Sequence, residues 1–404
     1  MRLVFVNHCH PETQHVCATR MREFARAMVI LGHEVILFTE TIPEGTSETP
    51  PQQTRKKIQD HDFSAPLYIS TQPKGHPLIK KLRDKKLPWG IRQVIIIWYF
   101  FYYKGVFTDW RAGSQSHLKP IAEYFKPDLI WATFSNTDAW NIARDLAKIS
   151  NVPWVGDIKD PWGIFIPAPF RKSLAQYFNS CAALTTFSHF NSIDAQKWFK
   201  SQKTIIYSGF WETGLHQNYT LNQDNINISL TGGIYDNQSL NQLFEGIKIW
   251  LLGLPKNKRS KVHLNYAGND NESVNKAAKK LTNLCHLNLL GFISIEELQK
   301  VHQNSIANLY IKINRTFHHK AIEILSAGRP VICYPEETDE VIDIANATNI
   351  AFHSCSTPEK ISEALSQSLS TASNNVHKNE NLKQLTWNFQ AKKLETLFQD
   401  IILN

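Results

Sequence analysis

Cysteine is scarce in this chain of 404 residues. Its six cysteines show no CxxC spacing, which argues against a disulfide framework. Glycine (17 residues) and proline (18 residues) are present in ordinary amounts, and this excludes a collagen-like or low-complexity chain. Met1-Arg2 runs directly into an apolar segment with no small-residue cleavage site, so we expect no signal peptide. The expected environment is a reducing cytosol, in which the thiols stay free.

A hydrophobic run long enough to cross a membrane is also missing. The apolar and aromatic stretch at residues 94–103 is about half as long as a membrane-spanning helix. Hydrophobic residues nevertheless make up 42% of the chain and charged residues 20%, which is typical of a folded protein and excludes a wholly disordered one. At about 100–200 residues per domain, the length predicts two domains.

Positive charge is in excess, with a formal net charge of +8 and a pI near 9.0. This excess attracts an anionic partner, which can be nucleic acid, an acidic membrane or a phosphorylated substrate. Composition alone does not distinguish these partners. The sequence contains no nucleic-acid-binding motif, and its basic residues cluster beside an apolar run, so we expect no nucleic-acid partner.

Predicted strands and helices alternate along the chain. Residues 2–8 and 34–39 are apolar and predict strands, and the segment between them has apolar residues at helical spacing. Such a unit is typical of a parallel sheet with helices on its faces. The alternation is interrupted by a polar segment rich in Asn and Gln and then resumes.

The sequence therefore predicts an α/β fold with two doubly wound domains. Ligands of such sheets bind at the carboxyl ends of the strands. The segment at residues 43–112 begins with residues that lack strong periodicity, and we expect it to be an excursion on the surface of the first domain. The expected organisation is a first domain at 1–208 with the excursion at 43–112, a linker at 209–225, a second domain at 226–385, and a final helix at 386–404.

The clearest chemical pattern is HKAIEILSAGRPVI at residues 319–332. The N-terminus of a helix favours anions, and Lys320 adds a positive charge beside it. Glu323 can accept hydrogen bonds from both hydroxyls of a vicinal diol. The combination favours a nucleotide sugar, with phosphate at the helix end and ribose on the carboxylate. The alternative is a solvated Lys-Glu pair on an ordinary helix.

This pattern resembles the donor-site signature of GT-B glycosyltransferases of the large retaining family 4. Three other segments carry the same resemblance in the same order along the chain. The segment VPWVGDIKDPW at 152–162 is similar to a segment of bacterial transferases of the group 1 type that build surface polysaccharides, with Lys159 in place of an arginine. GHEV at 32–35 is similar to the turn that follows the first long helix in that family. TGGIY at 231–235 is similar to the glycine-containing turn that opens the second domain.

The resemblance implies two Rossmann-like domains that face each other across a cleft, with the final helix crossing back to the first domain. The second domain would bind a nucleotide-diphosphate sugar and the first an acceptor. The implied reaction is retaining transfer of a hexose or N-acetylhexosamine to a sugar or lipid-linked oligosaccharide in surface-polysaccharide biosynthesis. No metal cofactor is expected, because in that family basic side chains and helix ends neutralise the leaving diphosphate.

The resemblance also assigns roles to residues. Glu323 matches the ribose-binding glutamate and Lys320 the basic residue near the phosphates. Asp157 or Asp160 would lie at the cleft edge of the first domain, where either orients the acceptor or supports positive charge on the reacting sugar; the alternative for one of them is a structural cap. The remaining donor-site candidates are Gly232, Gly233 and Tyr235 near the diphosphate, Gly291, Phe292 and Ile293 near the base, and Arg315 and His319.

The sequence departs from the family pattern at three places. Arg315 stands where the family has an acidic residue, and the loop at residues 11–16 has no glycine. A basic residue expected shortly after Gly233 is replaced by Asp236-Asn237-Gln238. These departures support an alternative function, a catalytically silent GT-B homologue that acts as a membrane-associated binding or scaffold protein.

Histidines and cysteines gather after the first predicted strand, at His8, Cys9, His10, His15 and Cys17. Such side chains can bind zinc, but their spacing matches no standard zinc site. We therefore favour a loop that lines the acceptor cleft, with His10 or His8 as a catalytic-site residue, and expect no metal.

The aromatic run at 94–103 has basic residues on both sides. One interpretation is a buried core helix. The other is a membrane-interface segment, because aromatic rings favour the interface and Lys and Arg favour anionic lipid. The resemblance favours the second interpretation, since acceptors of that family are often polyprenyl-linked sugars. The expected location is then the cytoplasm, with attachment to the inner face of the plasma membrane.

Overall fold

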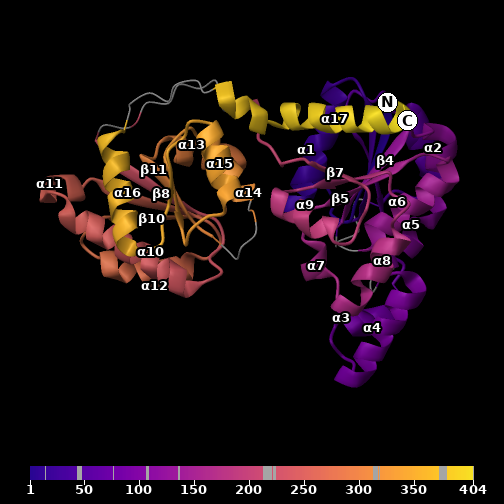
Figure 1. Ribbon diagram of the computed structural model, residues 1–404, viewed down its shortest axis with the longest axis horizontal. Coiled ribbons are helices and arrows are strands. Elements are labelled where there is room, and N and C mark those ends of the chain that lie inside the picture. Colours follow the sequence, from indigo (N-terminus) through magenta and orange to yellow (C-terminus); the bar gives the residue numbers. More distant parts are fainter. Residues whose placement is uncertain are drawn as a thin grey trace. The chain divides into compact units, whose positions relative to one another are not determined.

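The computed structural model describes two compact units, Met1–Ser208 with Trp387–Asn404 and Gly209–Thr386. The residues that it describes are 1–13, 15–42, 48–75, 77–105, 109–134, 137–212, 221, 224–312, 317, 319–372 and 380–403. We call the two parts unit 1 and unit 2. Each contains one sheet covered by helices (Figure 1).

Unit 1 contains a seven-stranded sheet in the order β3-β2-β1-β4-β5-β6-β7. Every neighbouring pair is parallel, so the carboxyl ends of all seven strands lie at the same edge of the sheet. The strand order reverses between β1 and β4, the kind of position where such sheets bind ligands. β4 is buried along its whole length, as expected of a strand with helices on both faces. The strands are β1 (Arg2–Asn7), β2 (Glu34–Glu40), β3 (Leu67–Thr71), β4 (Leu129–Phe134), β5 (Trp154–Ile158), β6 (Ala183–Thr186) and β7 (Gln202–Ile205).

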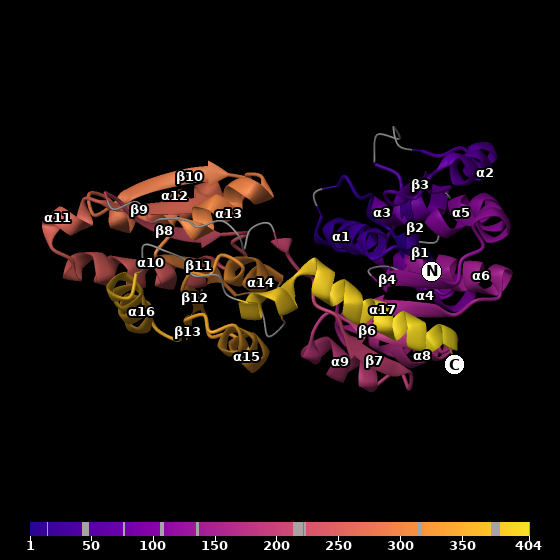
Figure 2. The ribbon, with the colours of Figure 1, turned by 90° about the horizontal axis from the view of Figure 1, so that it is seen from above.

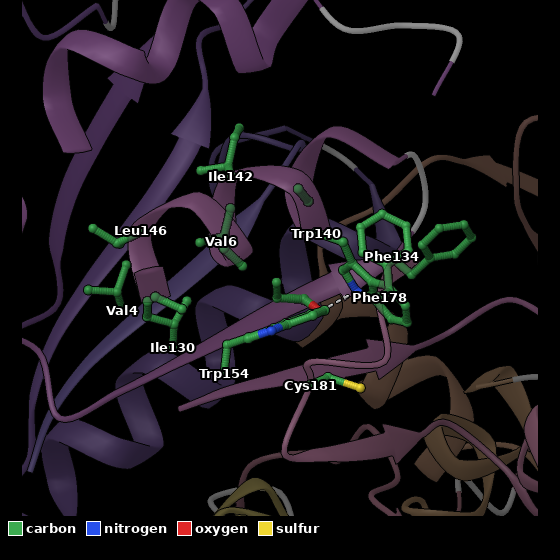
Figure 3. Packing of buried hydrophobic residues seen from close by; sticks show 14 of the residues in the cluster. Val4, Val6, Ile130, Phe134, Trp140, Ile142, Leu146, Trp154, Phe178 and Cys181 are labelled. Carbon is green, nitrogen blue, oxygen red and sulfur yellow. Dashed lines mark hydrogen bonds between the residues drawn. The ribbon is translucent and has the colours of Figure 1, made fainter. Parts of the chain in front are cut away.

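Several of the described helices of unit 1 pack against the strands of this sheet. The described helices are α1 (Val16–Ile30), α2 (Pro51–Asp60), α3 (Pro77–Arg83), α4 (Trp89–Tyr103), α5 (Asp109–Pro120), α6 (Thr137–Ser150), α7 (Trp162–Phe165), α8 (Arg171–Tyr177), α9 (His189–Gln196) and α17 (Trp387–Leu403), with a π-helical turn at Ile121–Phe125 and a 3-10 turn at Ala168–Phe170. Figure 3 shows part of the core, where Trp140 of α6 packs edge-on against Phe178 and Trp154 at 5.2 and 5.6 Å between ring centres. The buried Trp140 indole donates to the Ala132 carbonyl at 2.9 Å, so this large ring brings no unpaired donor into the core.

The C-terminal helix α17 belongs to unit 1 and lies along α1 (Figure 1, Figure 2). Trp387 packs edge-on against Phe24 with ring centres 5.1 Å apart. Glu395 contacts His33 at 2.8 Å, just after α1 ends. Unit 1 is therefore built from both ends of the chain.

Unit 2 contains a six-stranded parallel sheet in the order β10-β9-β8-β11-β12-β13. Helices α10 and α16 pack against each other and against β11. The strands are β8 (Ile226–Thr231), β9 (Val262–Ala267), β10 (His286–Gly291), β11 (Ala307–Ile311), β12 (Val331–Tyr334) and β13 (Phe352–Ser354). The helices are α10 (Asn237–Gly253), α11 (Lys256–Arg259), α12 (Asn271–Ala278), α13 (Ile295–Gln303), α14 (His319–Leu325), α15 (Asp339–Ala347) and α16 (Pro358–Ser370), with 3-10 turns at Lys279–Leu281 and Glu380–Leu385.

The predicted α/β class with two doubly wound sheets is confirmed. The prediction for residues 43–112 is wrong in part, because β3 in this segment pairs with β2 in the sheet and Trp110 of α5 is buried in the core. The core-helix interpretation of the aromatic run is also wrong, because most of its large side chains are exposed on α4. Of the helices in the described ranges, none combines the length and the apolar character needed to cross a membrane.

Candidate functional site

Three loops and one helix start meet at the carboxyl edge of the sheet in unit 2. The loops follow β8, β9 and β10, and backbone hydrogen bonds join them. Gly232 N–H donates to the Ala267 carbonyl at 2.8 Å, and Gly268 N–H donates to the Gly291 carbonyl at 2.9 Å. The Tyr266 hydroxyl donates to the Gly232 carbonyl at 3.1 Å. The loops are therefore held in one arrangement at the edge where doubly wound sheets bind ligands.

Lys320, near the start of α14, reaches the loop after β8. Its Nζ occupies the space that a side chain on Gly232 would fill, and Gly232 has a φ of +93°. The positive φ favours glycine at this position, and any larger residue would have to displace the Lys320 ammonium group. Burial lowers the pKa of Lys320, while Glu323, Cys333 and Asp270 oppose that shift. The loop after β8 thus has a cation placed directly against its backbone.

Glu323 lies one turn further along α14 and is 43% exposed. Its Oε1 is 3.1 Å from Nε2 of His319. Burial alone would raise the pKa of Glu323, but His319, His302 and Lys320 lower it more, so the net pKa is below the usual range. Lys320 and Glu323 thus engage different partners, Gly232 and His319, which argues against a simple solvated Lys-Glu pair.

Behind Glu323 is a histidine that sequence reasoning missed. His302 is buried at the end of α13, and its Nε2 is 2.8 Å from the Thr231 hydroxyl at the end of β8. Burial lowers the pKa of His302 to about 4, so its ring is neutral at neutral pH. Asp270 was missed as well; its carboxylate accepts from the Ile234 N–H at 2.8 Å and fixes the same loop. No local sequence signal marks either residue, since both act through contacts distant in sequence.

Beyond Gly232, the loop carries an exposed ring and an acidic cap. The Tyr235 ring lies against Gly233 and is exposed. Asp236 caps α10 by accepting from the backbone N–H groups of Gln238 and Ser239 at 3.0 and 2.9 Å. Hydrogen bonds from Ser239 and Gln238 lower the pKa of Asp236. Where the resemblance leads one to expect a cation, a carboxylate therefore occupies the N-terminus of α10.

The last residue of β10 and the loop after it provide three further candidates. Gly291 has a φ of +68°, Phe292 is exposed and Ile293 is half-buried. Ser294 then starts α13 with a capping box, which fixes the end of the loop. Arg315 lies outside the described residues.

Asp157, predicted at a substrate-facing edge, is instead buried in unit 1. Its two carboxylate oxygens accept from Arg20 at 2.9 and 3.0 Å, and Oδ1 also accepts from the Thr185 hydroxyl at 2.7 Å. Both members of the ion pair are fully buried. Arg20 also donates to Ser208 at 3.1 Å. Asp157 therefore ties α1, β5 and β6 together, and the expectation that it faces a substrate is corrected.

Asp160 follows the end of β5 and is half-buried. Burial raises the pKa of Asp160, while the neighbouring Lys159 lowers it. Lys159 itself donates to the Cys17 sulfur at 3.2 Å, and its carbonyl accepts from the Asn191 amide at 2.5 Å. Of the two predicted acids in this segment, Asp160 is thus the one that remains accessible.

His10 is buried, with only 5% of its surface exposed. Its Nδ1 accepts from the Glu12 N–H at 3.3 Å, and burial lowers its pKa. The predicted catalytic role does not fit this position, because the ring shapes its own loop. The same loop brings Cys9 within 3.1 Å of His8 and 3.4 Å of His15. Within the described ranges, no group of three or more His, Cys, Asp or Glu side chains is arranged to hold a metal ion.

The fold is similar to that of several solved proteins. Sucrose-phosphate synthase from Thermosynechococcus elongatus aligns over 100% of this chain and 99% of its own, with a TM-score of 0.64 and 13% identity. Anabaena HepE in complex with UDP and glucose aligns over 99% and 100%, with a TM-score of 0.58 and 11% identity. The chain has the GT-B fold.

The same fold also occurs in a different enzyme. A putative UDP-N-acetylglucosamine 2-epimerase from Listeria monocytogenes aligns over 99% of this chain and 96% of its own, with a TM-score of 0.54 and 12% identity. No protein-family model matches the sequence. No curated protein matches it in sequence either. At these identities the structural similarity establishes the fold, and function has to be argued from the site.

Proposed function

We propose that this protein is a retaining glycosyltransferase that moves a hexose or N-acetylhexosamine from a nucleotide-diphosphate sugar. The observation that carries the proposal is Lys320 seated against the Gly232 backbone, one helical turn from the accessible carboxylate of Glu323. The UDP complex of HepE, which shares the fold, supports a nucleotide sugar as the donor. The proposed acceptor is a saccharide or lipid-linked oligosaccharide of surface-polysaccharide biosynthesis.

In the proposed donor complex, Lys320 contacts the diphosphate and Glu323 accepts hydrogen bonds from the ribose hydroxyls. A cation held at a fixed loop can stabilise the negative charge that develops on the leaving diphosphate. We therefore propose transfer without a bound metal, so that turnover persists in EDTA. Asp160 is the proposed acid on the acceptor side.

A binding protein without catalysis is the second candidate, and Asp236 favours it. Its carboxylate closes the N-terminus of α10, which removes one place where a helix end could neutralise phosphate. The experiment is a titration of the purified protein with UDP, GDP and ADP and their sugars, followed by a product assay on the donor that binds. Transfer or donor hydrolysis supports the enzyme, binding without turnover supports the second candidate, and epimerisation of the sugar overturns both.

The outer surface of α4 supports a membrane partner. Its outward side chains Trp89, Ile91, Val94, Ile97, Trp98, Phe101 and Tyr102 are between 45% and 77% exposed. A helix that is apolar on all sides but exposed in water fits a membrane interface better than it fits solvent. Lys81, Lys85 and Lys86 precede it and are exposed. We propose that α4 lies in an anionic membrane surface and brings the protein to a lipid-linked acceptor at the cytoplasmic face.

A further inference from the structure

Unit 1 contains a cavity of about 370 Å³ on the inner side of α4. This volume is within the range of about 300–1,000 Å³ that is usual for small-molecule sites. The walls come from α3, α4, α5 and α6 and from the loop after β3, and none of them carries a residue of the candidate site described above. The polar and aromatic lining residues are Lys74, Tyr99, Tyr103, Asp109, Arg111, Gln115 and Asp145.

One wall consists of planar polar groups that fix one another. Arg111 donates to both oxygens of Asp145, at 2.8 and 2.9 Å. The Gln115 amide donates to Asp145 at 3.3 Å and to the Arg111 carbonyl at 3.1 Å, which leaves its carbonyl oxygen as an acceptor. Donors and acceptors therefore alternate along this wall at positions set by an ion pair.

The charges around the cavity cancel. Lys74 and Arg111 are cationic, and Asp109 and Asp145, both in the lining, are anionic. Such a set gives no net attraction for a phosphate or for a cation. It can still donate hydrogen bonds to hydroxyl groups and accept hydrogen bonds from them. The lining is therefore suited to an uncharged ligand with many hydroxyls.

The wall formed by α4 is aromatic. Tyr99 and Tyr103 stack with ring centres 5.1 Å apart and an interplanar angle of 30°. A tyrosine ring offers an apolar face together with a polar hydroxyl, which matches a sugar ring with C–H groups on one face and hydroxyls at its rim. The Tyr103 ring also contacts Trp98 and Tyr102, which belong to the exposed outer side of α4. Tyr103 thus lines the cavity and also contacts the apolar outer side of the same helix.

We infer that this cavity holds an uncharged saccharide, the head group of a glycolipid whose apolar chain lies along the outer side of α4. The inference rests on the proposed function for its lipid-linked acceptor and adds a place where that acceptor is held. It differs from simple membrane adsorption, because adsorption requires the apolar surface and the basic residues but no sugar.

The test is calorimetric titration of the whole protein with two amphiphiles of equal chain length, octyl glucoside and octylphosphocholine, below their micelle concentrations. We expect octyl glucoside to bind about tenfold more tightly, the equivalent of one or two hydrogen bonds. Gln115→Ala and Tyr103→Ala should remove this preference. Tyr102→Ala is the matched control on the outer side of α4. It should weaken the binding of both amphiphiles equally and leave the preference for octyl glucoside unchanged.

Equal affinity for the two head groups would overturn the inference, as would a preference that survives both cavity variants. Circular dichroism of each variant verifies the fold, and Gln115→Ala, on an exposed side chain of α5, remains informative if Tyr103→Ala unfolds. UDP titration of the same samples separates the two proposals. If the wild-type protein does not bind UDP, the proposed donor site is wrong. If it binds UDP but does not prefer octyl glucoside, only the saccharide site in the cavity is wrong.

Discussion

The Nζ of Lys320 lies where the first side-chain carbon of any residue other than glycine at position 232 would have to be. This contact joins the loop after β8 to the start of α14, two segments far apart in sequence. It also makes position 232 a sensitive test of the donor site, since a single methyl group would displace the cation.

Gly232→Ala should weaken binding of a nucleoside diphosphate by about tenfold or more, because a displaced charge-assisted contact is worth about 1.5–3 kcal/mol. The positive φ should also lower the free energy of unfolding by about 1–2 kcal/mol. Gly253→Ala is the control, because a methyl group there meets no atom within 4 Å. Titration calorimetry and urea denaturation measure the two effects. Unchanged affinity in a folded Gly232→Ala protein would place the phosphates elsewhere.

Glu323→Gln should weaken donor binding by about 1.5–3 kcal/mol, because a carboxylate makes stronger hydrogen bonds to ribose hydroxyls than an amide does. Glu363→Gln on the exposed side of α16 should have no effect. The lowered pKa of Glu323 keeps the carboxylate charged, so its contribution should be constant between about pH 6 and pH 8 and decline only in acid. Affinity that rises as this carboxylate becomes protonated would contradict the assignment.

Asp157→Asn should destabilise unit 1 without any specific effect on substrate. Removing one charge from a buried ion pair leaves Arg20 uncompensated, which costs about 3–5 kcal/mol of unfolding free energy. The control is Glu123→Gln in the exposed pair with Lys119, for which about 0–1 kcal/mol is expected. Urea denaturation at neutral pH measures both. If the Asp157→Asn protein is stable but has lost turnover, Asp157 has a role in catalysis and its assignment as a structural residue is wrong.

Asp160→Asn should show the opposite profile. The side chain is half-buried at the end of β5, so stability should change little. If it acts on the acceptor side, turnover should fall while donor affinity is retained, because its contribution appears mainly in the transition state. Turnover equal to the wild type in a working transfer assay would remove this segment from the mechanism.

Replacing Val94 and Trp98 together by serine should reduce sedimentation of the protein with anionic vesicles. Both side chains are exposed, so the fold should persist. Binding of the wild type should fall with salt, since each basic residue near the surface contributes about 1 kcal/mol and charges are screened over about 10 Å at 0.1 M. The contrasting variant is Phe100→Ser, which removes a buried ring stacked on Phe170 at 4.5 Å and should instead unfold this region. If the wild-type protein does not sediment with anionic vesicles at low salt, the membrane proposal is refuted.

The alternation of strands and helices along the chain was enough to predict the fold class, because parallel sheets are built from such alternating units and central strands such as β4 are buried along their whole length. β3 was missed for a physical reason. It is a short edge strand in a segment rich in Pro, Thr and Lys. Its pairing with β2 stabilises a strand that its own sequence does not predict.

The site could be predicted only in part. The Lys320 and Glu323 pattern is local, so it was visible in the sequence. The burial of Asp157 depends on Arg20, which is distant in the chain, and no local pattern reports such a pair. The sequence did not show whether α4 is a core helix or a membrane-interface helix. A helix with apolar residues on every side has no periodicity that separates an inner face from an outer one.

The return of α17 to α1 has a consequence for synthesis of the protein on the ribosome. Phe24 and His33 are made early, but their partners Trp387 and Glu395 are among the last residues to emerge. At the usual rates of translation, unit 1 waits on the order of tens of seconds for its final helix, while all of unit 2 is made in between. During that interval the apolar side of α1 is uncovered, so a nascent chain stalled before α17 should be a substrate for chaperones and proteases even though unit 2 is complete.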